Sequence, residues 1–293
     1  MTDTLPLSDF GVARPAFKTQ LLKWIGNKQR LAPEILANFP SFWNTYHEPF
    51  LGSGGVLGTL APEKAYASDV LPPLMEIWQL LEDDPAQLVA NYAMYRDQID
   101  EGVAKQDVYR AALDSFNASP NGRDFVFLTR ACYGGVVRFR RNDGAMSTPC
   151  GAHTPMPTAS FEKRVQEWST RIQGTTFRTM DFRQAFDDVA SGDMVYCDPP
   201  YTDSQTILYG AQAFKLHDLI EVIDSAKRKG ARVALSIDGT KKSGLKEVLH
   251  DFPSGLFVSE VGVTVGRSML RRFQLSGETL ESEVVRDRLL LTY

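Results

Sequence analysis

Strand-like runs alternate with helical segments near both ends of the chain, and this alternation constrains the fold more than any other feature of the sequence. The expected strands are residues 44–50, 64–69, 175–182, 193–201 and 231–238, with a closing pair at 256–265 and 284–293. The helices expected around them are residues 28–39, 56–61, 71–84 and 217–230. Such alternation favours a mostly parallel sheet with helices on both faces, which is the α/β class.

Residues 81–175 interrupt this pattern, because helical spacing of apolar residues continues there without a strand. The expected helices of this region are residues 88–99, 107–116 and 123–133. Residues 129–157 are rich in Gly, Pro and Arg, which favours a long loop or a hairpin. We therefore expect a core made of residues 1–80 and 176–293, interrupted by an insert at 81–175 that is large enough for a small domain.

The net charge excludes capture of nucleic acid by bulk charge, because 32 Lys and Arg against 36 Asp and Glu leave a formal charge of −4. The insert differs locally, since five arginines between residues 123 and 141 stand against one aspartate. An acidic protein needs a local basic patch of this kind to bind DNA. Hydrophobic residues at 43% and charged residues at 23% are typical of a globular chain and exclude a disordered one.

The cysteines and the chain's hydropathy indicate its compartment. Cys132, Cys150 and Cys197 form no C-x-x-C pair, which argues against a structural zinc site and favours a reduced, intracellular protein. We expect no metal site. The N-terminus lacks the features of a signal peptide, and no apolar run approaches the roughly 20 residues of a membrane span. The expected location is the cytoplasm, without a membrane partner.

The tetrapeptide Asp198-Pro199-Pro200-Tyr201 follows directly on the apolar residues 194–197. Ligands of open α/β sheets bind beyond the carboxyl ends of the strands, where this tetrapeptide is expected. Consecutive prolines stiffen the turn, so the Asp198 carboxylate, a backbone carbonyl and the Tyr201 ring are held in one arrangement. Two acceptors and an aromatic face suit a planar amine. The alternative is an ordinary turn that closes a strand.

A glycine turn, Glu-Pro-Phe-Leu-Gly-Ser-Gly-Gly at residues 48–55, lies between an expected strand and an expected helix. Glycines in this position let the backbone approach a bound cofactor. The spacing is not that of a G-x-G-x-x-G dinucleotide fingerprint. Glu48 would repel a pyrophosphate and attract a cationic ligand. A plain tight turn is the alternative.

Acids also end the neighbouring expected strands. Asp69 can accept hydrogen bonds from ribose hydroxyls, and Asp181 can accept one from an adenine amino group while Phe182 covers the ring. Helix capping by the acids and a core position for Phe182 are the alternatives. Residues 23–28, Lys-Trp-Ile-Gly-Asn-Lys, add an aromatic ring, a glycine and two cations, although the tryptophan also suits the core. Because the carboxyl ends of neighbouring strands converge, we expect these segments to meet in one crevice.

Five short motifs resemble, in their order, those of the Dam-type DNA adenine-N6 methyltransferases. They are KWIGNK (23–28), EPFLGSGG (48–55), ASD (67–69), MDF (180–182) and DPPY (198–201). The resemblance covers residues 18–293 and implies a Rossmann-like S-adenosylmethionine-dependent methyltransferase fold with a target-recognition insert. It implies methyl transfer from S-adenosylmethionine to N6 of adenine in double-stranded DNA, with the target base flipped out of the helix.

The resemblance and the local chemistry together assign the site residues. The expected catalytic residues are Asp198, Pro199, Pro200 and Tyr201. The expected cofactor-binding residues are Trp24, Gly26, Lys28, Glu48, Pro49, Phe50, Gly52, Gly54, Asp69, Asp181, Phe182 and Asp198, with Asp69 at the ribose and Asp181 and Phe182 at the adenine ring. The expected DNA-binding residues are Lys23, Arg130, Tyr133, Gly134, Arg138, Arg140 and Pro149. Solvated surface arginines are the alternative for the arginines, of which Arg138 or Arg140 would suit a bidentate contact to guanine.

The recognition segment departs from the family pattern. Dam-like enzymes usually have N-G-x-x-R-x-N followed by G-x-F-N-V-P-F-G. Residues 133–140 and 144–151 retain the arginine, the proline and both framing glycines, but they lack the Phe-Asn-Val core. A GATC target is therefore not implied.

In the expected mechanism Asp198 and the Pro199 carbonyl each accept one N6 hydrogen, which turns the nitrogen lone pair toward the sulfonium methyl. The carboxylate stabilises the positive charge that grows on N6. Stacking of Tyr201 on the base adds on the order of 1 kcal/mol. Neither a metal nor a covalent enzyme intermediate is needed.

The sequence leaves several alternatives open. Methylation of cytosine N4 uses the same acceptor geometry, although its motif more often begins with Ser, and RNA or protein-amide methylation more often uses Asn. A non-catalytic DNA-binding module and a nicotinamide-dependent oxidoreductase are the alternatives from other classes. The expected form in solution is a monomer. In a restriction–modification system, a restriction endonuclease acting on the same site would be a further partner.

Overall fold

The computed structural model describes residues 11, 14–200, 214–238, 240–241, 246–247, 252–266 and 285–293. Tyr201, expected to take part in catalysis, lies outside the described residues.

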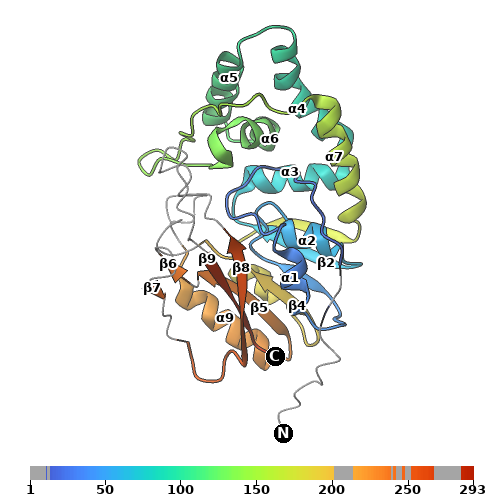
Figure 1. Ribbon diagram of the computed structural model, residues 1–293, viewed down its shortest axis with the longest axis vertical. Coiled ribbons are helices and arrows are strands. Elements are labelled where there is room, and N and C mark those ends of the chain that lie inside the picture. The colour runs from blue at the N-terminus through green and yellow to red at the C-terminus, as the bar shows by residue number, and fades with distance from the viewer. Residues whose placement is uncertain are drawn as a thin grey trace.

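A seven-stranded sheet runs through the described part of the molecule (Figure 1). Its strands are β1 (Tyr46–Glu48), β2 (Ala65–Asp69), β3 (Thr175–Thr179), β4 (Met194–Cys197), β5 (Arg232–Asp238), β8 (Ser259–Gly266) and β9 (Val285–Leu291), in the order β3-β2-β1-β4-β5-β9-β8. β1 to β5 are parallel to one another, whereas β9 is antiparallel to both β5 and β8. The short strands β6 (Thr240–Lys241) and β7 (Lys246–Glu247) form a separate antiparallel pair. The predicted α/β class, the mostly parallel sheet and the closing strand pair are confirmed.

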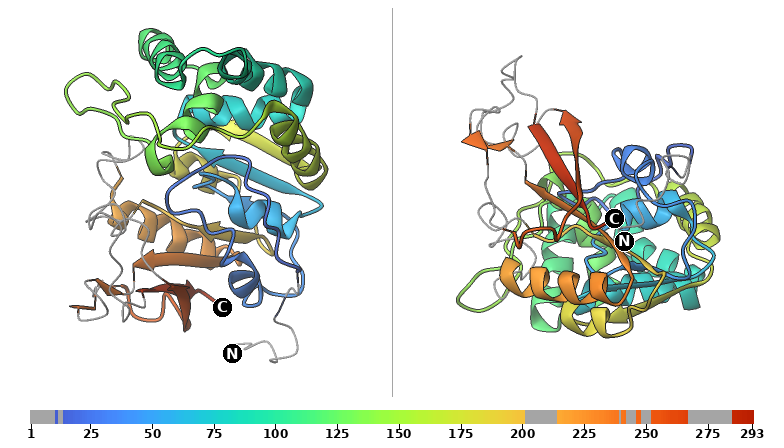
Figure 2. Two further views of the ribbon diagram at one scale, coloured as in Figure 1. Left: turned by 45° about the horizontal axis from the view of Figure 1, so that its top comes forward. Right: turned by 90° about the horizontal axis from the view of Figure 1, so that it is seen from below.

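Helices cover both faces of the sheet (Figure 2). One face packs against α1 (Ala32–Leu36), α2 (Gly55–Leu60) and α3 (Pro72–Asp83), and the other against α8 (Phe182–Asp187) and α9 (Leu216–Arg228). Alternation along β4 serves both layers, because Met194 and Tyr196 belong to the first hydrophobic cluster and Val195 and Cys197 to the second.

The first helix is shorter than the expected 28–39. Residues 28–31 form turns instead, and α1 begins at Ala32 with Pro33 in its first turn, which is where a helix accepts proline. The turn brings the Lys28 side chain into contact with the end of β4. The short helix α8 was not predicted; Asp181 begins it with a capping box that includes Gln184.

The insert consists of α4 (Pro85–Asp100), α5 (Lys105–Ala118), α6 (Gly122–Ala131), the short 3-10 helix η2 (Tyr133–Gly135) and α7 (Thr158–Arg171), and it lies beyond α3 from the sheet (Figure 1). The three expected helices are confirmed, but α7 was not predicted. Trp168 of α7 is fully buried and packs against Trp78 of α3, with ring centroids 5.2 Å apart. The insert therefore shares one hydrophobic core with the first face of the sheet.

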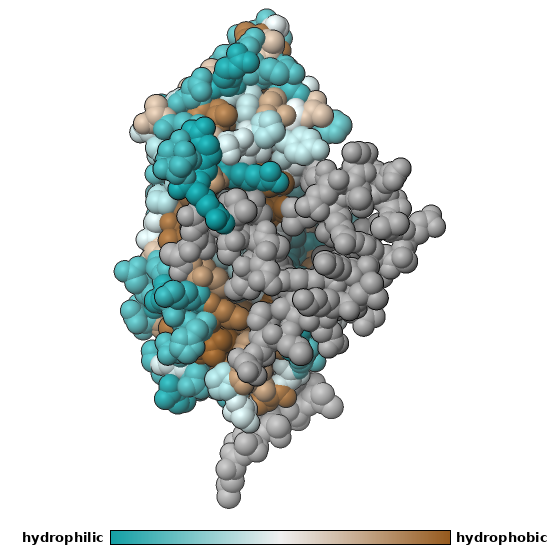
Figure 3. All heavy atoms as spheres, turned by 90° about the vertical axis from the view of Figure 1, so that its left-hand side faces the viewer, coloured by the Kyte–Doolittle hydropathy of each residue, from teal (hydrophilic) through white to brown (hydrophobic). Residues whose placement is uncertain are grey.

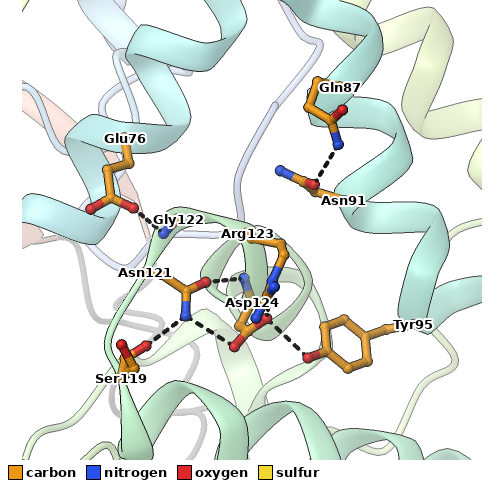
Figure 4. A network of polar contacts seen from close by, with 9 residues as sticks. All are labelled: Glu76, Gln87, Asn91, Tyr95, Ser119, Asn121, Gly122, Arg123 and Asp124. Carbon is orange, nitrogen blue, oxygen red and sulfur yellow. Dashed lines mark hydrogen bonds and ion pairs between the residues drawn. The ribbon is translucent and has the colours of Figure 1, made fainter.

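A polar network fixes the start of α6 to α3 and α4 (Figure 4). The fully buried Asp124 accepts hydrogen bonds from the Tyr95 hydroxyl and from Nδ2 of the capping residue Asn121, at 2.9 and 3.1 Å. Glu76 of α3 accepts the Gly122 N–H at 2.5 Å. A buried polar group without a partner destabilises the folded protein, so these hydrogen bonds favour one position of α6.

Residues 132–150 form an antiparallel hairpin, here called the arginine hairpin. Cys132 lies opposite Cys150, and Phe139 opposite Met146. Asn117 of α5 joins the hairpin through two hydrogen bonds with the backbone of Met146, at 2.7 and 3.0 Å. The predicted loop or hairpin is thus confirmed as a hairpin held against α5.

Candidate functional site

A cavity of about 1060 Å³, partly open to solvent, lies at the carboxyl ends of the parallel strands. β1 and β4 are neighbours in the sheet, and the chain continues from β1 toward β2 and β3 but from β4 toward β5. Ligands of open α/β sheets bind where the strand order reverses in this way. The described residues that line the cavity are Trp24, Ile25, Gly26, Asn27, Lys28, Glu48, Pro49, Phe50, Leu51, Gly52, Ser53, Gly55, Val56, Asp69, Val70, Asp181, Phe182, Tyr196, Asp198, Pro199, Pro200 and Phe214.

The structure brings the expected cofactor-binding residues together around this cavity. Gly54 alone among them does not line it, although its neighbours Ser53 and Gly55 do. Gly54 has a φ of 64°, and a Cβ atom there would lie 2.9 Å from Cη2 of Trp78. Trp78 also donates from Nε1 to the Gly52 carbonyl at 3.0 Å. The glycine turn is therefore packed directly onto α3, and Gly54 supports the cavity through its backbone.

Glu48 is the buried acid at the end of β1. It accepts a hydrogen bond from the Tyr46 hydroxyl at 2.6 Å and is 3% exposed. Burial, and to a lesser extent the nearby charge of Asp198, raise the pKa of Glu48 to about 8, even though the Tyr46 hydrogen bond acts in the opposite direction. Burial thus disfavours the carboxylate form of Glu48, so its attraction for a cation develops as the cation binds.

Asp198 is the acid at the end of β4, and it is paired. Lys28 Nζ lies 2.8 Å from Asp198 Oδ1, and the two side chains are 7% and 19% exposed. Burial raises the pKa of Asp198, while Lys28 acts in the opposite direction. Burial alone would lower the pKa of Lys28, but Asp198 and Asp287 raise it above its ordinary value. The ammonium of Lys28 therefore favours the carboxylate form of Asp198 in a site that otherwise disfavours charge.

The acids after β2 and β3 bind backbone amides. Asp69 accepts the N–H groups of Gly52 and Leu71 at 3.1 and 3.2 Å, and burial raises its pKa. Asp181 accepts the Arg183 N–H at 2.9 Å and also pairs with the Arg183 guanidinium at 2.8 Å. Asp181 therefore does cap a helix, and the same residue lines the cavity.

Three phenyl rings form an aromatic wall of the cavity. Phe50 and Phe182 are stacked with centroids 5.2 Å apart, and Phe214 meets both rings edge-on at 5.9 and 5.8 Å. Phe214 was missed in the sequence because it stands alone before α9, outside any motif. Tyr196 and Asn27 were also missed; strand alternation could have identified Tyr196, whose hydroxyl lies 2.9 Å from Ser236 Oγ.

Most of the expected DNA-binding residues are exposed on one side of the molecule. Tyr133, Gly134, Arg138 and Pro149 are exposed on the arginine hairpin, and Lys23 is exposed beside it. A Cβ atom on Gly135 would lie 2.9 Å from Cβ of Lys23, so the two segments are in direct contact. Figure 3 faces this side and shows hydrophilic residues projecting from the upper half of the molecule.

The arginines of this region differ in what they contact. Arg140 makes a bidentate ion pair with Asp143, at 3.0 and 2.6 Å. Arg138 is exposed, and its backbone N–H donates to Thr148 Oγ1 at 3.0 Å. Within the described hairpin, a neighbouring carboxylate therefore pairs with the guanidinium of Arg140 but not with that of Arg138.

Arg130, one of the expected DNA-binding residues, is buried, unlike the others named above. Arg130 is 5% exposed and donates from one guanidinium nitrogen to the carbonyls of Leu21 and Gln20, at 2.6 and 3.2 Å. Burial lowers its pKa to about 10. Arg130 thus links α6 to the segment that precedes Lys23 by hydrogen bonds inside the protein, and its side chain does not face solvent.

Within the described residues, no group of three or more His, Cys, Asp and Glu side chains is placed to hold a metal ion. No helix in the same part of the chain has both the length and the apolar character to cross a bilayer.

Comparison with known proteins gives a family match, curated relatives and structural neighbours. The family model for D12 class N6 adenine-specific DNA methyltransferases matches residues 24–254. The Type II methyltransferase M1.LlaDCHI of Lactococcus lactis subsp. cremoris is 24% identical, covering 78% of this chain and 83% of the relative. A DNA adenine methylase of Haemophilus influenzae is 29% identical, covering 78% and 82%. A solved rRNA methyltransferase of Streptomyces viridochromogenes superimposes with a TM-score of 0.35 at 14% identity, covering 99% and 94%.

Proposed function

This chain belongs to the D12 class of N6 adenine-specific DNA methyltransferases, and from that premise we propose that it transfers the methyl group of S-adenosylmethionine to N6 of an adenine flipped out of duplex DNA. The observation that carries the proposal is the meeting of two segments at one cavity: the Asp198-Pro199-Pro200 turn after β4 and the glycine turn after β1. A tritiated methyl-transfer assay on mixed-sequence duplex DNA tests it.

The residues around the cavity fit S-adenosylmethionine. Asp69 offers carboxylate oxygens for a ribose diol, the stacked rings of Phe50 and Phe182 provide an apolar wall for a purine, and Glu48 offers a buried carboxyl group for a cation. When bound, this cofactor supplies an electrophilic methyl group on a positively charged sulfur. Lys28 and Trp24 complete the proposed cofactor site.

We infer the chemical step from the turn after β4. Asp198 and the Pro199 carbonyl accept the two N6 hydrogens of adenine, which makes the nitrogen lone pair available for attack. The carboxylate is already in place when positive charge develops on N6, so it stabilises that charge without reorganisation. Lys28 contacts Oδ1 of Asp198 at 2.8 Å, and we propose that Oδ2 accepts from the amine. Asp198 then accepts or passes on the proton that N6 loses.

Binding of the cofactor should release a proton from Glu48. Since burial raises the pKa of Glu48 to about 8, a cationic ligand placed beside it lowers that pKa and drives ionisation at pH 7. We expect calorimetric titrations in two buffers of different ionisation enthalpy to show close to one more proton released by the wild-type protein than by Glu48→Gln.

The Glu48→Gln variant should also bind S-adenosylmethionine about tenfold or more weakly, since the developed charge pair is lost. Asn38→Asp is the control: it exchanges an amide for a carboxyl group at a partly exposed residue just after α1, outside the described lining of the cavity, and should leave proton release unaltered. Equal proton release by wild type and Glu48→Gln would show that Glu48 does not face the cationic part of the ligand.

The arginine hairpin is the proposed reader of DNA sequence, with Lys23 beside it. Base flipping costs a few kcal/mol, and contacts to the surrounding duplex offset that cost. Arg138 is suited to a bidentate contact with guanine in the major groove. The cofactor would then bind to the core, residues 1–80 and 176–293. The DNA sequence would be read by the insert, residues 81–175.

Arg138→Ala should reduce affinity for the recognition sequence about tenfold to a hundredfold and relax discrimination at one base pair. Arg140→Ala should have a smaller effect, because Asp143 already occupies its guanidinium. Arg228→Ala, on α9 with a side chain 72% exposed, is the control. Fluorescence anisotropy measures the affinity of the three variants for DNA that carries the recognition sequence and for DNA with single base-pair substitutions in it. If Arg138→Ala binds as well as Arg228→Ala, Arg138 does not contact the DNA.

The proposal also covers the oligomeric state of the protein and a protein partner. Relatives of this chain include a Type II methyltransferase and a modification methylase, names that place those proteins in restriction–modification. We propose that this chain acts on duplex DNA as a monomer, and that an endonuclease for the same sequence is its partner if it serves in such a system.

A further inference from the structure

Lys28 has a second carboxylate beside it, from a part of the chain that no motif singled out. Its ammonium lies 3.7 Å from Asp287 Oδ2, in addition to 2.8 Å from Asp198 Oδ1 and 3.5 Å from the Gly26 carbonyl. The Asp287 side chain is 9% exposed. Asp287 is not among the described residues that line the cavity.

Three separate segments deliver these charges to one place. Lys28 precedes α1, and Asp198 directly follows β4. Asp287 lies on the antiparallel strand β9, where its backbone is in register with residue 238 of β5. The next residue on β9, Arg288, pairs with Glu260 of β8 on the solvent side. Strand alternation thus turns Asp287 inward and Arg288 outward.

Burial of this group is costly for the fold. Removing two carboxylates and an ammonium from water is costly, and their mutual attraction offsets this cost only in part. An apolar triad of similar volume would stabilise the protein at least as well. The charges at this place are therefore better explained by what they do for Asp198 than by stability.

We propose that Asp287 is a positioning residue for methyl transfer: it holds the ammonium of Lys28, and Lys28 in turn holds the carboxylate of Asp198. This inference rests on the proposed function, since it assumes that Asp198 accepts from the amine. Lysine is a point charge on a flexible four-carbon chain, so one partner alone does not fix it. A second carboxylate, at 3.7 Å, further restricts the positions that the ammonium can take.

Asp287 also balances charge. The methylated nitrogen becomes positive during transfer, and a lysine that belonged to Asp198 alone would cancel much of the carboxylate's stabilising effect. Because Asp287 shares the ammonium, Asp198 keeps more of its negative charge for the amine. The acceptor oxygen and the charge it carries would both depend on β9.

The test is Asp287→Asn, measured as the single-turnover rate of methyl transfer at saturating cofactor and DNA. We expect the rate to fall about tenfold to a hundredfold, while the dissociation constants of S-adenosylmethionine and DNA change less than about twofold. The acid limb of the pH–rate profile should move to lower pH. Asp198 faces Lys28, Asp287, Glu48, Tyr196 and Cys197, and Asp287 is one of the charges that raise its pKa, so neutralising Asp287 lowers that pKa.

Two further variants separate positioning from a structural role. Asp287→Glu keeps the charge and should leave the acid limb at the wild-type pH while recovering part of the rate. Glu260→Gln removes a carboxylate of similar kind from the neighbouring strand and should change neither quantity. If Asp287→Asn does not fold, Asp287→Ser is a second neutral variant, whose smaller side chain leaves room for water. The same changes in rate and in the acid limb are expected for it.

The outcomes are distinct. A wild-type protein that binds S-adenosylmethionine but methylates no adenine contradicts the proposed function itself. A wild-type protein that methylates adenine, together with a folded neutral variant at 287 whose rate and acid limb are unchanged, overturns only the role of Asp287. A reduced rate with an unmoved acid limb also overturns it, because loss of folded protein lowers the rate without altering the pH profile.

Discussion

Replacement of Asp198 by alanine should abolish methyl transfer, with a loss of at least about 10³-fold in the single-turnover rate. The Asp198 carboxylate, which lies 2.8 Å from the Lys28 ammonium, is the acceptor that the amine requires. Cofactor binding should be retained at least in part, because Asp69, Phe50 and Glu48 bind other parts of the cofactor in the proposed site. Calorimetry with S-adenosylmethionine and a radiolabelled transfer assay measure the two effects separately.

Asp198→Asn is the companion variant, since it preserves the shape of the side chain and removes only its charge. It should be as inactive as the alanine variant within about tenfold, because an amide stabilises little of the positive charge on N6. Asp193→Asn is not a suitable control, as it breaks the buried pair with His47. Asp188→Asn, whose carboxylate is 46% exposed and pairs with Arg178, is suitable. An Asp198→Ala protein that remained active would end this mechanism.

The second large effect is on stability. Trp168→Ala should lower the free energy of unfolding by about 3–5 kcal/mol, the usual cost of truncating a buried tryptophan. Trp168 is fully buried, packs edge-on to Phe17 at 5.2 Å, and donates from Nε1 to the Thr19 carbonyl at 2.9 Å. Its ring also fills the space beside Gly58, where a Cβ atom would lie 2.4 Å from it.

Urea unfolding followed by circular dichroism measures this change. Phe42→Ala is the matched control, because the Phe42 side chain is 64% exposed and its loss should alter the free energy of unfolding by about 0.5 kcal/mol or less. A Trp168→Ala protein as stable as Phe42→Ala would show that the insert is not anchored to the core through α7. That result would also favour an insert that folds as a domain of its own.

Much of the fold could be predicted because its strands are short apolar runs that end on acids or glycines. Those ends are also where an α/β sheet binds ligands, so the sequence positions of Glu48, Asp69, Asp181 and Asp198 pointed to a single site. The structure places all four around one cavity. The family resemblance added the chemistry of that cavity, which strand periodicity could not supply.

Other parts depended on contacts between distant segments. Arg130 looks like any arginine of a basic patch, and only the fold shows that its guanidinium binds the carbonyls of Gln20 and Leu21. Asp287 carries no local signal, because it becomes relevant only when β9 pairs with β5 and meets Lys28. Helix α7 was hidden by a polar sequence whose few apolar residues, among them Phe161, Val165 and Trp168, are spaced for one narrow buried stripe.

The central claim is that adenine receives the methyl group at N6, and mass spectrometry tests this claim most directly. The purified wild-type protein is incubated with S-adenosylmethionine and unmethylated duplex DNA of mixed sequence, and the DNA is digested to nucleosides. We expect N6-methyladenine in amounts that rise with enzyme and time and vanish with Asp198→Ala. N4-methylcytosine alone, or no methylated base from a protein that binds the cofactor and the DNA, would contradict it.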